Sequence, residues 1–417
     1  MKIAIIGSGI SGLTCAYLLA EHHNITLFEA NSYLGGHSNT LDVTLGGTTY
    51  SVDTGFIVYN EKTYPHFNNI LNELDVPTQA SNMSFSVKCE KTGLEYKPTS
   101  INTLFGQRRN LFNPQFFGMV RGILAFNKGA RNLLEQDGDY HYTVKQFSKK
   151  NKINSLTFEK FIIPMASAIW SSPPEKISYL PMRYLARFYS NHGLLSINDH
   201  PQWRVIKGGS REYVNRMIFR FSDSIKLNSK VVGITRTNEG IKLKTETGDV
   251  VNYDAVILAC HSDQSLKILA DPTPDETEIL SSISYQKNTA LLHTDSSVLP
   301  IQKRIWASWN SNIPIKKEDL VSLTYNMNIL QSLDAPETIC VSLNMEERIN
   351  SEKVLERIVY YHPVYTKQTV ESQNRKDEIS GFNNTYYAGA YWKYGFHEDG
   401  VVSALDVCRK LGVQFSV

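Results

Sequence analysis

Residues 2–29 read KIAIIGSGISGLTCAYLLAEHHNITLFE, and this stretch decides the fold. A short apolar run (2–6) precedes a glycine turn, a helical pattern follows, and a second apolar run (25–29) ends in Glu29. The turn has the spacing G-x-G-x-x-G, with Gly7, Gly9 and Gly12. This order of strand, turn, helix, strand and acid predicts the nucleotide-binding part of an α/β, Rossmann-type domain.

Each residue of this pattern has a physical task. Gly7 permits the tight turn, Gly9 lets a pyrophosphate approach the backbone, and Gly12 lets the helix pack closely on the strand. The N-terminal N–H groups of the helix that follows face the phosphates, and we include Ser11, which lies within the turn, among the cofactor-binding residues. Glu29 can accept hydrogen bonds from a ribose diol, and its charge disfavours the 2′-phosphate of NADP.

Composition narrows the class of protein. The chain has 417 residues, with 43 basic and 41 acidic side chains, which predicts two or three domains and disfavours bulk nucleic-acid binding. Its five cysteines are odd in number and lack C-x-x-C spacing, so we expect free thiols, no metal site and a cytoplasmic location. We identify no signal peptide and no apolar window long enough for a membrane-spanning helix.

Patterns further along the chain predict more elements. Residues 225–260 alternate between apolar and polar, which predicts three or four strands, the last over 255–259. Residues 385–412 predict a strand, an aromatic loop and a helix with Asp399 as its N-cap. The polar segment 135–155 reads as a surface connection.

Residues 96–134 carry an unusual charge. No acidic residue falls between Glu95 and Glu135, and six basic residues do: Lys97, Arg108, Arg109, Arg121, Lys128 and Arg131. Asn113 and Pro114 predict the start of a helix. Its helically spaced residues are Phe116, Phe117, Val120, Ile123, Leu124 and Asn127. A basic amphipathic helix is typical of a peripheral contact with an anionic membrane. The alternative is an ordinary helix packed on its own domain.

Three stretches resemble the flavin-containing amine oxidase, phytoene desaturase and protoporphyrinogen oxidase superfamily. The first is the glycine turn with Glu29. The second is EANSYLGGH (29–37), where His37 stands in place of the arginine that most members have after the paired glycines. The third is AGAYWKYGFHEDGVVSA (388–404), similar to the segment that closes over the flavin. In such segments Gly400 and Val401 open a helix directed at the cofactor.

The chain resembles more closely a bacterial subfamily of NAD/FAD-binding, amine oxidase-like proteins. The stretches that carry this likeness are DTGFIVYN (53–60), NMSFSV (82–87), PMASAIWSSP (164–173), NHGLLSINDHPQWRVIKGGSREYV (191–214), TYNMNILQSL (324–333) and YYHPVYT (360–366). Such proteins often occur beside cyclopropane-fatty-acid-synthase-like methyltransferases. The resemblance therefore implies a lipid or other hydrophobic substrate.

The resemblance also implies a set of site residues. It favours FAD over NAD, bound non-covalently, since no cysteine lies in the closing loop before Gly389. The expected cofactor-binding residues are Gly7, Gly9, Ser11, Gly12, Glu29, Gly35, Gly36, His37, Gly55, Phe56, Val231, Gly389, Asp399, Gly400 and Val401. Candidate walls of the substrate site are Tyr391, Trp392 and Tyr394, although ordinary packing would also explain them. Cys260 reads as the end of a buried strand, and no catalytic residue is assigned.

Two classes of function follow from this reading. One is an FAD-dependent oxidase or desaturase that moves hydride from a hydrophobic, fatty-acyl substrate to flavin N5. The other is a non-redox flavoprotein, either a double-bond isomerase or a lipid-binding partner of a methyltransferase. Amine oxidation is a third reading, but the sequence shows no amine-binding cage. The oligomeric state stays open.

Two discontinuous domains are expected. The FAD-binding domain comprises 1–75, 203–265 and 380–417, and a mixed α+β substrate domain comprises 76–202 and 266–379.

Overall fold

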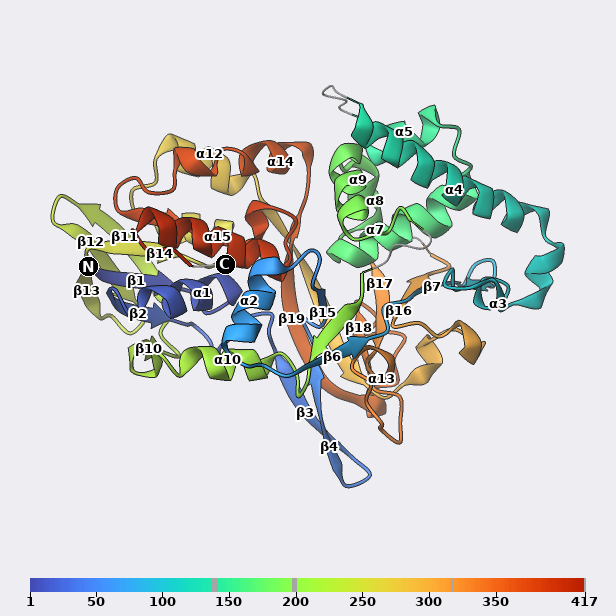
Figure 1. The fold of residues 1–417 in the computed structure, drawn as a ribbon, viewed down its shortest axis with the longest axis horizontal. Coiled ribbons are helices and arrows are strands. Elements are labelled where there is room, and N and C mark those ends of the chain that lie inside the picture. Colours follow the sequence, from blue (N-terminus) through green and yellow to red (C-terminus); the bar gives the residue numbers. More distant parts are fainter. Residues whose placement is uncertain (137–141, 197–200, 317, 416–417) are drawn as a thin grey trace.

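The computed structural model describes residues 1–136, 142–196, 201–316 and 318–415. At one end of the molecule lies a five-stranded sheet in the order β10-β2-β1-β14-β20 (Figure 1). Its strands are β1 (Lys2–Ile6), β2 (Asn24–Phe28), β10 (Ile225–Lys226), β14 (Ala255–Leu258) and β20 (Thr385–Tyr387). All neighbouring pairs run parallel, so the predicted α/β, Rossmann-type sheet is confirmed.

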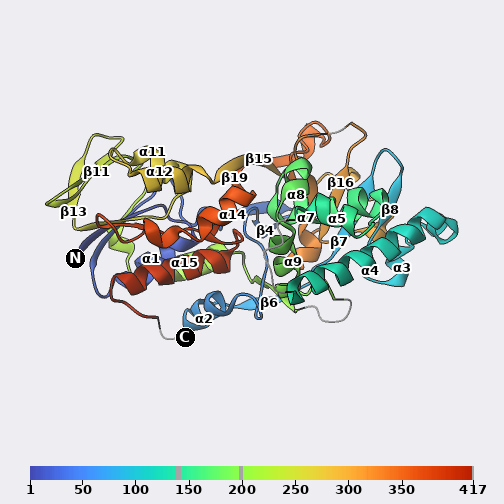
Figure 2. The same ribbon diagram turned by 90° about the horizontal axis from the view of Figure 1, so that it is seen from above.

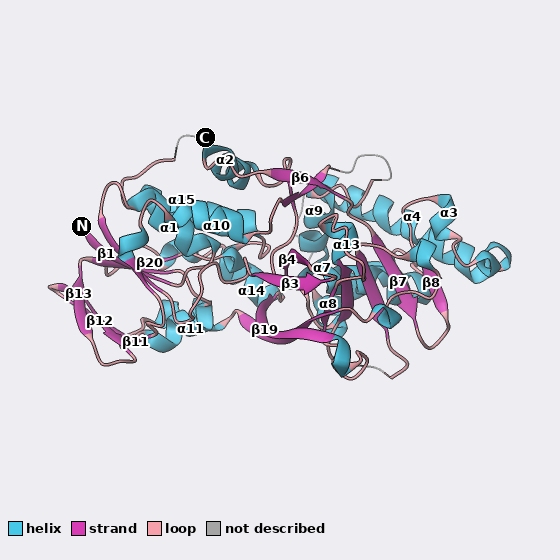
Figure 3. Cartoon of the chain, turned by 90° about the horizontal axis from the view of Figure 1, so that it is seen from below, coloured by secondary structure: helices cyan, strands magenta, loops and turns pink. Residues whose placement is uncertain are grey.

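Both faces of this sheet are covered. Alternate residues of β1 point to opposite sides, because side chains alternate along a strand. Ile3 and Ile5 join a core formed with helices on one face, whereas Ala4 and Ile6 join a second core. The first face carries α1 (Ile10–Leu19), α2 (Pro65–Glu73), α10 (Arg211–Ile218) and α15 (His397–Lys410). Figure 3 shows α1, α10 and α15 together on this face.

The opposite face carries a smaller antiparallel sheet and two helices. The sheet has the order β11-β12-β13, with β11 (Val231–Thr237), β12 (Gly240–Thr245) and β13 (Val250–Tyr253). The helices are α11 (Ser262–Ile268) and α12 (Pro274–Ser281). Residues of β11, β12 and α12 share a core with Ala4 and Ile6, which anchors this layer to the parallel sheet.

A seven-stranded mixed sheet forms the centre of the other half. Its order is β19-β15-β18-β17-β16-β7-β8. The strands are β7 (Phe85–Cys89), β8 (Leu94–Tyr96), β15 (Ser284–His293), β16 (Trp309–Ile313), β17 (Ser322–Asn326), β18 (Cys340–Leu343) and β19 (Val354–Val364). The long pair β15–β19 reaches back toward the parallel sheet (Figure 1).

Helices and small sheets complete this half. The helices are α3 (Ile101–Leu104), α4 (Pro114–Glu135), α5 (Val144–Lys150), α6 (Ser155–Thr157), α7 (Ile163–Trp170), α8 (Pro174–Tyr179), α9 (Met182–Asn191) and α13 (Met327–Leu330). Helix α14 (Lys367–Gln373) lies in the other half, beside α12 (Figure 1). The small strands are β3 (Thr40–Leu45), β4 (Thr48–Asp53), β5 (Tyr59–Asn60), β6 (Thr78–Ser81) and β9 (Trp203–Ile206). Figure 2 shows α3 and α4 at the end of the molecule farthest from the N-terminus.

The structure corrects three predictions about elements. Residues 225–260 form five strands rather than three or four, because the two-residue β10 also pairs with β2. The segment 135–155 is more than a connection, since it contains α5, capped by the Thr143 side chain; residues 137–141 lie outside the described chain. Helix α15 begins at His397 with Phe396 as its N-cap.

Asp399 is therefore not the N-cap of α15. It lies at the third helical position, where its carboxylate accepts a hydrogen bond from the backbone N–H of Phe396 at 3.0 Å. Gly400 and Val401 accordingly lie inside the helix and do not open it. A carboxylate in the first turn satisfies an N–H group that the helix itself leaves free, so Asp399 supports the helix start from within.

Candidate active site

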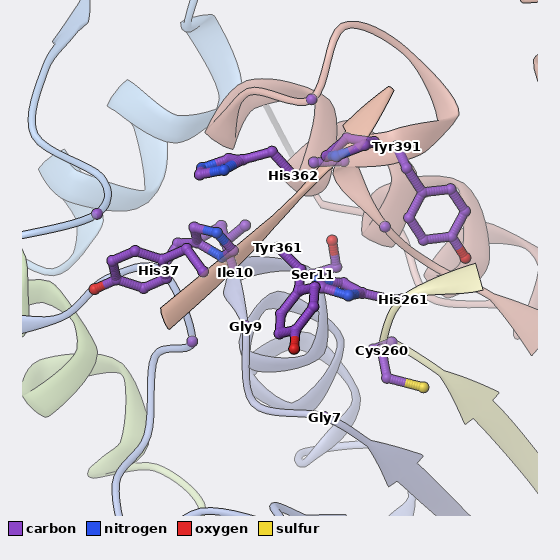
Figure 4. Close-up of a pocket in the computed structure, with 18 of the residues that line it drawn as sticks. Gly7, Gly9, Ile10, Ser11, His37, Cys260, His261, Tyr361, His362 and Tyr391 are labelled. Atoms are coloured by element: carbon purple, nitrogen blue, oxygen red, sulfur yellow. The ribbon is translucent and has the colours of Figure 1, made fainter. Parts of the chain in front are cut away.

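A cavity of about 820 Å³ lies between the parallel sheet and the seven-stranded sheet. The glycine turn after β1 forms its floor, together with the loops after β2 and β14. Strand β19 and the segment 389–397 form other walls. Figure 4 shows the turn at Gly7 and Gly9 facing His37 and His362 across this space. Strands that are far apart in the sequence therefore end at, or line, the same cavity.

The three glycines of the turn meet different neighbours. Gly7 has a φ of +101°, and a Cβ there would lie 2.8 Å from the Ala259 carbonyl oxygen. A Cβ on Gly12 would lie 1.9 Å from the Gly7 carbonyl oxygen. A Cβ on Gly9 would meet nothing within 4 Å, although Gly9 lines the cavity. The open backbone at Gly9 is the feature that a pyrophosphate needs, so the turn fits a dinucleotide.

Glu29 holds the glycine turn in place through hydrogen bonds. The carboxylate, in a side chain that is 7% exposed, accepts hydrogen bonds from the Ser8 N–H at 3.0 Å and the Ser8 hydroxyl at 2.6 Å. It also accepts from the Asn31 backbone N–H at 2.9 Å and the Asn31 side-chain amide at 3.0 Å. Glu29 lines the cavity, so it is placed to meet a ribose while holding the turn. The sequence reasoning did not identify Ser8.

The paired glycines bring the next loop against the turn. Gly36 has a φ of +59°, and a Cβ there would lie 3.2 Å from the Gly9 Cα. His37 follows, stacked on Tyr360 with ring centroids 4.9 Å apart. Its Nε2 atom is buried and has no hydrogen-bond partner among the described residues. Burial lowers the pKa of His37 to about 4, so the side chain that follows the paired glycines carries no positive charge at neutral pH.

Most predicted site residues line the cavity. These are Gly7, Gly9, Ser11, Glu29, Gly35, Gly36, His37, Gly55, Phe56, Val231, Gly389, Tyr391 and Tyr394. The remaining five are Gly12, Trp392, Asp399, Gly400 and Val401.

Those five occupy other places. Gly12 lies behind Gly7, and Trp392 packs in the core beside the parallel sheet. The Gly400 carbonyl accepts a hydrogen bond from the Ser11 hydroxyl at 3.0 Å, and α15 packs closely on α1 here because Gly400 itself has no side chain. Val401 is fully buried in the other core, which includes Ile3 and Ile5, and Asp399 lines a smaller neighbouring cavity. Trp392 therefore does not form the wall that the sequence suggested.

The part of the cavity away from the turn is aromatic. Its ring-bearing residues include Trp170, Tyr285, Trp309, Tyr325, Tyr360, Tyr361, Tyr365, Tyr391, Tyr394 and Phe396. Glu29 is the one carboxylate among the described residues that line the cavity. An apolar chamber with few charges suits a hydrophobic, uncharged reacting group.

Four histidines line the cavity, and the sequence reasoning identified only His37. Burial lowers the pKa of His261 to about 4 and that of His362 to about 3, and it also lowers the pKa of His397 well below the usual value. All four rings are therefore neutral at physiological pH. His362 lies in YYHPVYT (360–366), a stretch that resembles the subfamily, and this resemblance could have identified His362 as a site residue from the sequence.

Cys260 also lines the cavity, next to His261. Burial raises the pKa of its thiol to about 11, so the sulfur is protonated and is a weak nucleophile. Among the residues that the structure describes, no group of histidine, cysteine and acidic side chains could hold a metal ion. Within the same residues, no helix combines the length and apolarity needed to cross a membrane.

Comparison with protein families matches residues 10–313 to the family described as flavin containing amine oxidoreductase. The L-amino-acid oxidase of Siganus canaliculatus is 21% identical over 333 residues, which are 73% of this chain and 57% of that protein. Amine oxidase A of Bos taurus is 23% identical over 277 residues, 64% of this chain and 50% of that protein. The chain thus spans somewhat more than half the length of one relative and half that of the other.

Solved structures share the fold at low identity. Cyclohexylamine oxidase from Brevibacterium oxydans superposes with a TM-score of 0.69 and 14% identity, covering 99% of both chains. The fatty acid isomerase from P. acnes that produces CLA superposes with a TM-score of 0.68 and 15% identity, covering 98% of both chains. The architecture of the whole chain is therefore that of an FAD-binding α/β fold.

Proposed function

The chain belongs to the flavin containing amine oxidoreductase family, whose cofactor is FAD, and on that premise we propose that it oxidises a hydrophobic, fatty-acyl substrate. The observation that carries this proposal is one cavity that runs from the open backbone at Gly9 to an aromatic chamber, and Glu29 is the single carboxylate among its described lining residues. FAD when bound supplies an acceptor for a hydride from carbon. The chain supplies binding, orientation and exclusion of water.

The chain's own residues divide the cavity between cofactor and substrate. The glycine turn and the start of α1 would hold the pyrophosphate, and Glu29 would meet the ribose. Gly55 and Phe56 would approach the ring system from the loop after β4. No cysteine lies in the segment 385–396, which favours non-covalent attachment. The aromatic residues of β16, β17 and α7 would surround the acyl chain and keep water out.

A double-bond isomerase is the second candidate. The neutral histidines are the observation that favours it, because uncharged groups can polarise a substrate without stabilising a separated charge. One solved structure with this fold is a fatty acid isomerase. The isomerase and the oxidoreductase proposals therefore share the same class of substrate, a fatty-acyl chain. Amine oxidation is a third candidate, because aromatic rings such as those that line the described cavity attract a cationic amine without a carboxylate.

The test is an anaerobic titration of FAD-loaded protein with oleic acid, linoleic acid and cyclohexylamine, followed by flavin absorbance and mass spectrometry of the lipid. Bleaching by an acid with loss of two hydrogens from the chain supports the oxidoreductase. An unchanged flavin with a moved double bond supports the isomerase. Bleaching by the amine alone contradicts both lipid readings. The Gly9→Leu variant, expected to lack flavin, controls for reactions without cofactor.

We also propose that the protein is cytoplasmic and contacts anionic membranes peripherally through residues 96–134. The outward side of α4 supports this, with Phe117 40% exposed and Leu124 49% exposed beside the exposed Arg121 and Lys128. Nearby, Phe112 is 89% exposed and Ile101 is 79% exposed. Exposed apolar side chains among basic ones suit an anionic bilayer surface, where both attractions act together.

A further inference from the structure

His362 and His37 face each other inside the cavity. His362 lies near the end of β19, and His37 lies on the loop after the paired glycines. Their ring centroids are 5.3 Å apart in an edge-to-face arrangement, and both rings line the cavity (Figure 4). Nε2 of His362 has no hydrogen-bond partner among the described residues, whereas its Nδ1 lies 2.9 Å from the side-chain nitrogen of Asn288.

A chain of hydrogen bonds fixes the direction of that contact. It begins at the backbone N–H of Thr289, which can only donate and reaches Oδ1 of Asn344 at 3.0 Å. The Asn344 amide nitrogen then donates to the Val321 carbonyl at 3.0 Å and to Oδ1 of Asn288 at 2.8 Å. Both amides are therefore oriented by backbone groups whose roles cannot be exchanged.

The chain ends at the imidazole. With its oxygen held by Asn344, Asn288 directs its amide nitrogen to the Ser171 carbonyl at 3.0 Å and to Nδ1 of His362. An amide nitrogen only donates, so Nδ1 accepts and the proton of the neutral ring is on Nε2. A proton added at Nδ1 would face another donor. This agrees with the low pKa that burial gives His362.

The residues that hold this chain adopt uncommon backbone conformations. Ser171 ends α7 with a φ of +47°, and Asn344 has a φ of +55°, both in the left-handed region that non-glycine residues enter at a cost. Strained residues concentrate where a site must be held in one geometry. Ser171 and Asn344 are two of eight described non-glycine residues with a positive φ, and both contact Asn288, which in turn contacts His362.

We propose that His362, with Nε2–H as a fixed and uncharged donor, and His37 form a subsite for a carbonyl oxygen. An uncharged donor suits a carbonyl better than a carboxylate, which pairs best with a cation. The oxygen can come from the acyl group of a substrate or from the flavin ring, and the chemistry is the same. Asn288 and Asn344 are positioning residues. The inference rests on the proposed function, because it places FAD and a hydrophobic substrate in this cavity.

The test uses FAD-loaded protein and methyl nonyl ketone with an isotope-labelled carbonyl, a probe with a hydrophobic chain and one acceptor oxygen. Infrared difference spectra of the His362→Phe variant are compared with wild type, with His362→Gln, which restores a donor N–H, and with His22→Phe on the surface. We expect His362→Phe to weaken ketone binding about three- to tenfold, the usual effect of one uncharged hydrogen bond. Its labelled carbonyl band should shift to higher frequency, and His362→Gln should reverse part of both effects.

The spectral bands separate the two sources of oxygen. A shift of the labelled band shows that the donor serves the substrate, and a shift confined to the flavin carbonyl bands shows that it serves the cofactor. Either outcome supports the subsite. Unmoved bands and unchanged affinity in a variant with full FAD content overturn it. Absence of FAD from the wild-type protein would instead overturn the proposed function, so the two failures are distinguishable.

The Asn288→Leu variant tests the positioning role. Without its partner, Nδ1 of His362 no longer has a donor to fix the tautomer, so we expect a broadened carbonyl band and a smaller loss of affinity than in His362→Phe. A carbonyl band identical to that of wild type, in a variant that retains FAD, would contradict the role of the amide chain.

Discussion

At the scale of single residues, FAD binding is predicted to require that Gly9 has no side chain. Replacing Gly9 with leucine should abolish FAD binding, because its side chain would enter the open space above the turn. The measurement is flavin absorbance of the purified, FAD-supplemented protein. Gly118→Leu is the matched control, since its Cβ also meets nothing within 4 Å but lies in α4, outside the cavity lining. Normal flavin content in Gly9→Leu would refute the placement of the pyrophosphate.

Glu29 has two tasks: it holds the glycine turn, and it is predicted to bind the ribose. Glu29→Ala removes four hydrogen bonds to Ser8 and Asn31 as well as the predicted ribose contact. We expect FAD affinity to fall by about 1–3 kcal/mol, the cost of leaving such partners unmade. Calorimetric titration of the apoprotein measures this. Glu29→Gln keeps the size of the side chain and should retain part of the affinity.

The same variants report on cofactor choice. Neither Glu29→Ala nor Glu29→Gln should gain the ability to use NADP. No arginine is among the described residues that line the cavity, so none is placed to bind a 2′-phosphate. Unchanged FAD affinity in Glu29→Ala would show that other groups hold the ribose.

At the scale of elements, α4 has one buried side and one exposed side. Phe116 is buried, as are Met119 and Phe126, so one side packs on its own half of the molecule. Phe117 and Leu124 face outward with Arg121 and Lys128. None of these basic residues forms an ion pair within the described chain, so their charge is available to a partner. The wheel alone did not separate the two sides, because apolar residues occur on both.

This surface yields a prediction about vesicles. Co-sedimentation should occur with mixed phosphatidylserine and phosphatidylcholine vesicles and weaken with salt, because the charges are exposed. The double variant Arg121→Glu/Lys128→Glu should bind at least about tenfold more weakly, since each basic residue contributes about 1 kcal/mol near such a surface. Phe112→Ser should also reduce binding.

Two controls match these variants in exposure. Phe219 is 89% exposed, as Phe112 is, and lies at the end of α10. Phe219→Ser and the double variant Lys242→Glu/Lys244→Glu on β12 should therefore leave sedimentation nearly unchanged. Equal losses in both sets would indicate a general charge effect, and the membrane contact would then be wrong.

At the scale of the whole molecule, the cavity lies between two sheets, and each sheet is built from segments that are separated in the sequence. Strands of the parallel sheet come from 1–75, 203–265 and 380–417, and strands of the seven-stranded sheet come from 76–202 and 266–379. The division into two domains at these boundaries is our proposal for the strands of these two sheets. Other elements cross the boundaries: α12 packs on the parallel sheet, whereas β3, β4 and β9 share a core with the seven-stranded sheet. Residues from both groups line the cavity, so a ligand there contacts both.

This arrangement predicts a single response to FAD. Thermal unfolding of the FAD-loaded protein should show one transition, shifted upward relative to the apoprotein. The expected stabilisation is about 2.7 kcal/mol when free FAD exceeds its dissociation constant a hundredfold. Differential scanning calorimetry measures it, and Gly9→Leu should show no shift. Two transitions, of which FAD moves one, would mean that the second domain does not share the site.

The sequence alone determined the parallel sheet, the glycine turn and the acid after β2, because these depend on local order: an apolar run, a turn that only glycine permits, and a helix that follows at once. It also predicted α4 from Asn113 and Pro114, whose side chain and ring favour a helix start whatever surrounds them. The predicted N-cap of α15, Asp399, was wrong. The actual N-cap is Phe396, which lacks the polar side chain by which an N-cap is usually identified in a sequence.

Only the tertiary structure decided which side chains share the cavity. Trp392 and Tyr394 are two residues apart, yet one packs in the core and the other lines the site. His37 and His362 are far apart in sequence, and their meeting depends on β19 reaching the loop that follows the paired glycines. The tautomer of His362 depends on residues of four separate segments. Such contacts follow from how sheets pack and twist together, a property of the whole chain that local spacing does not encode.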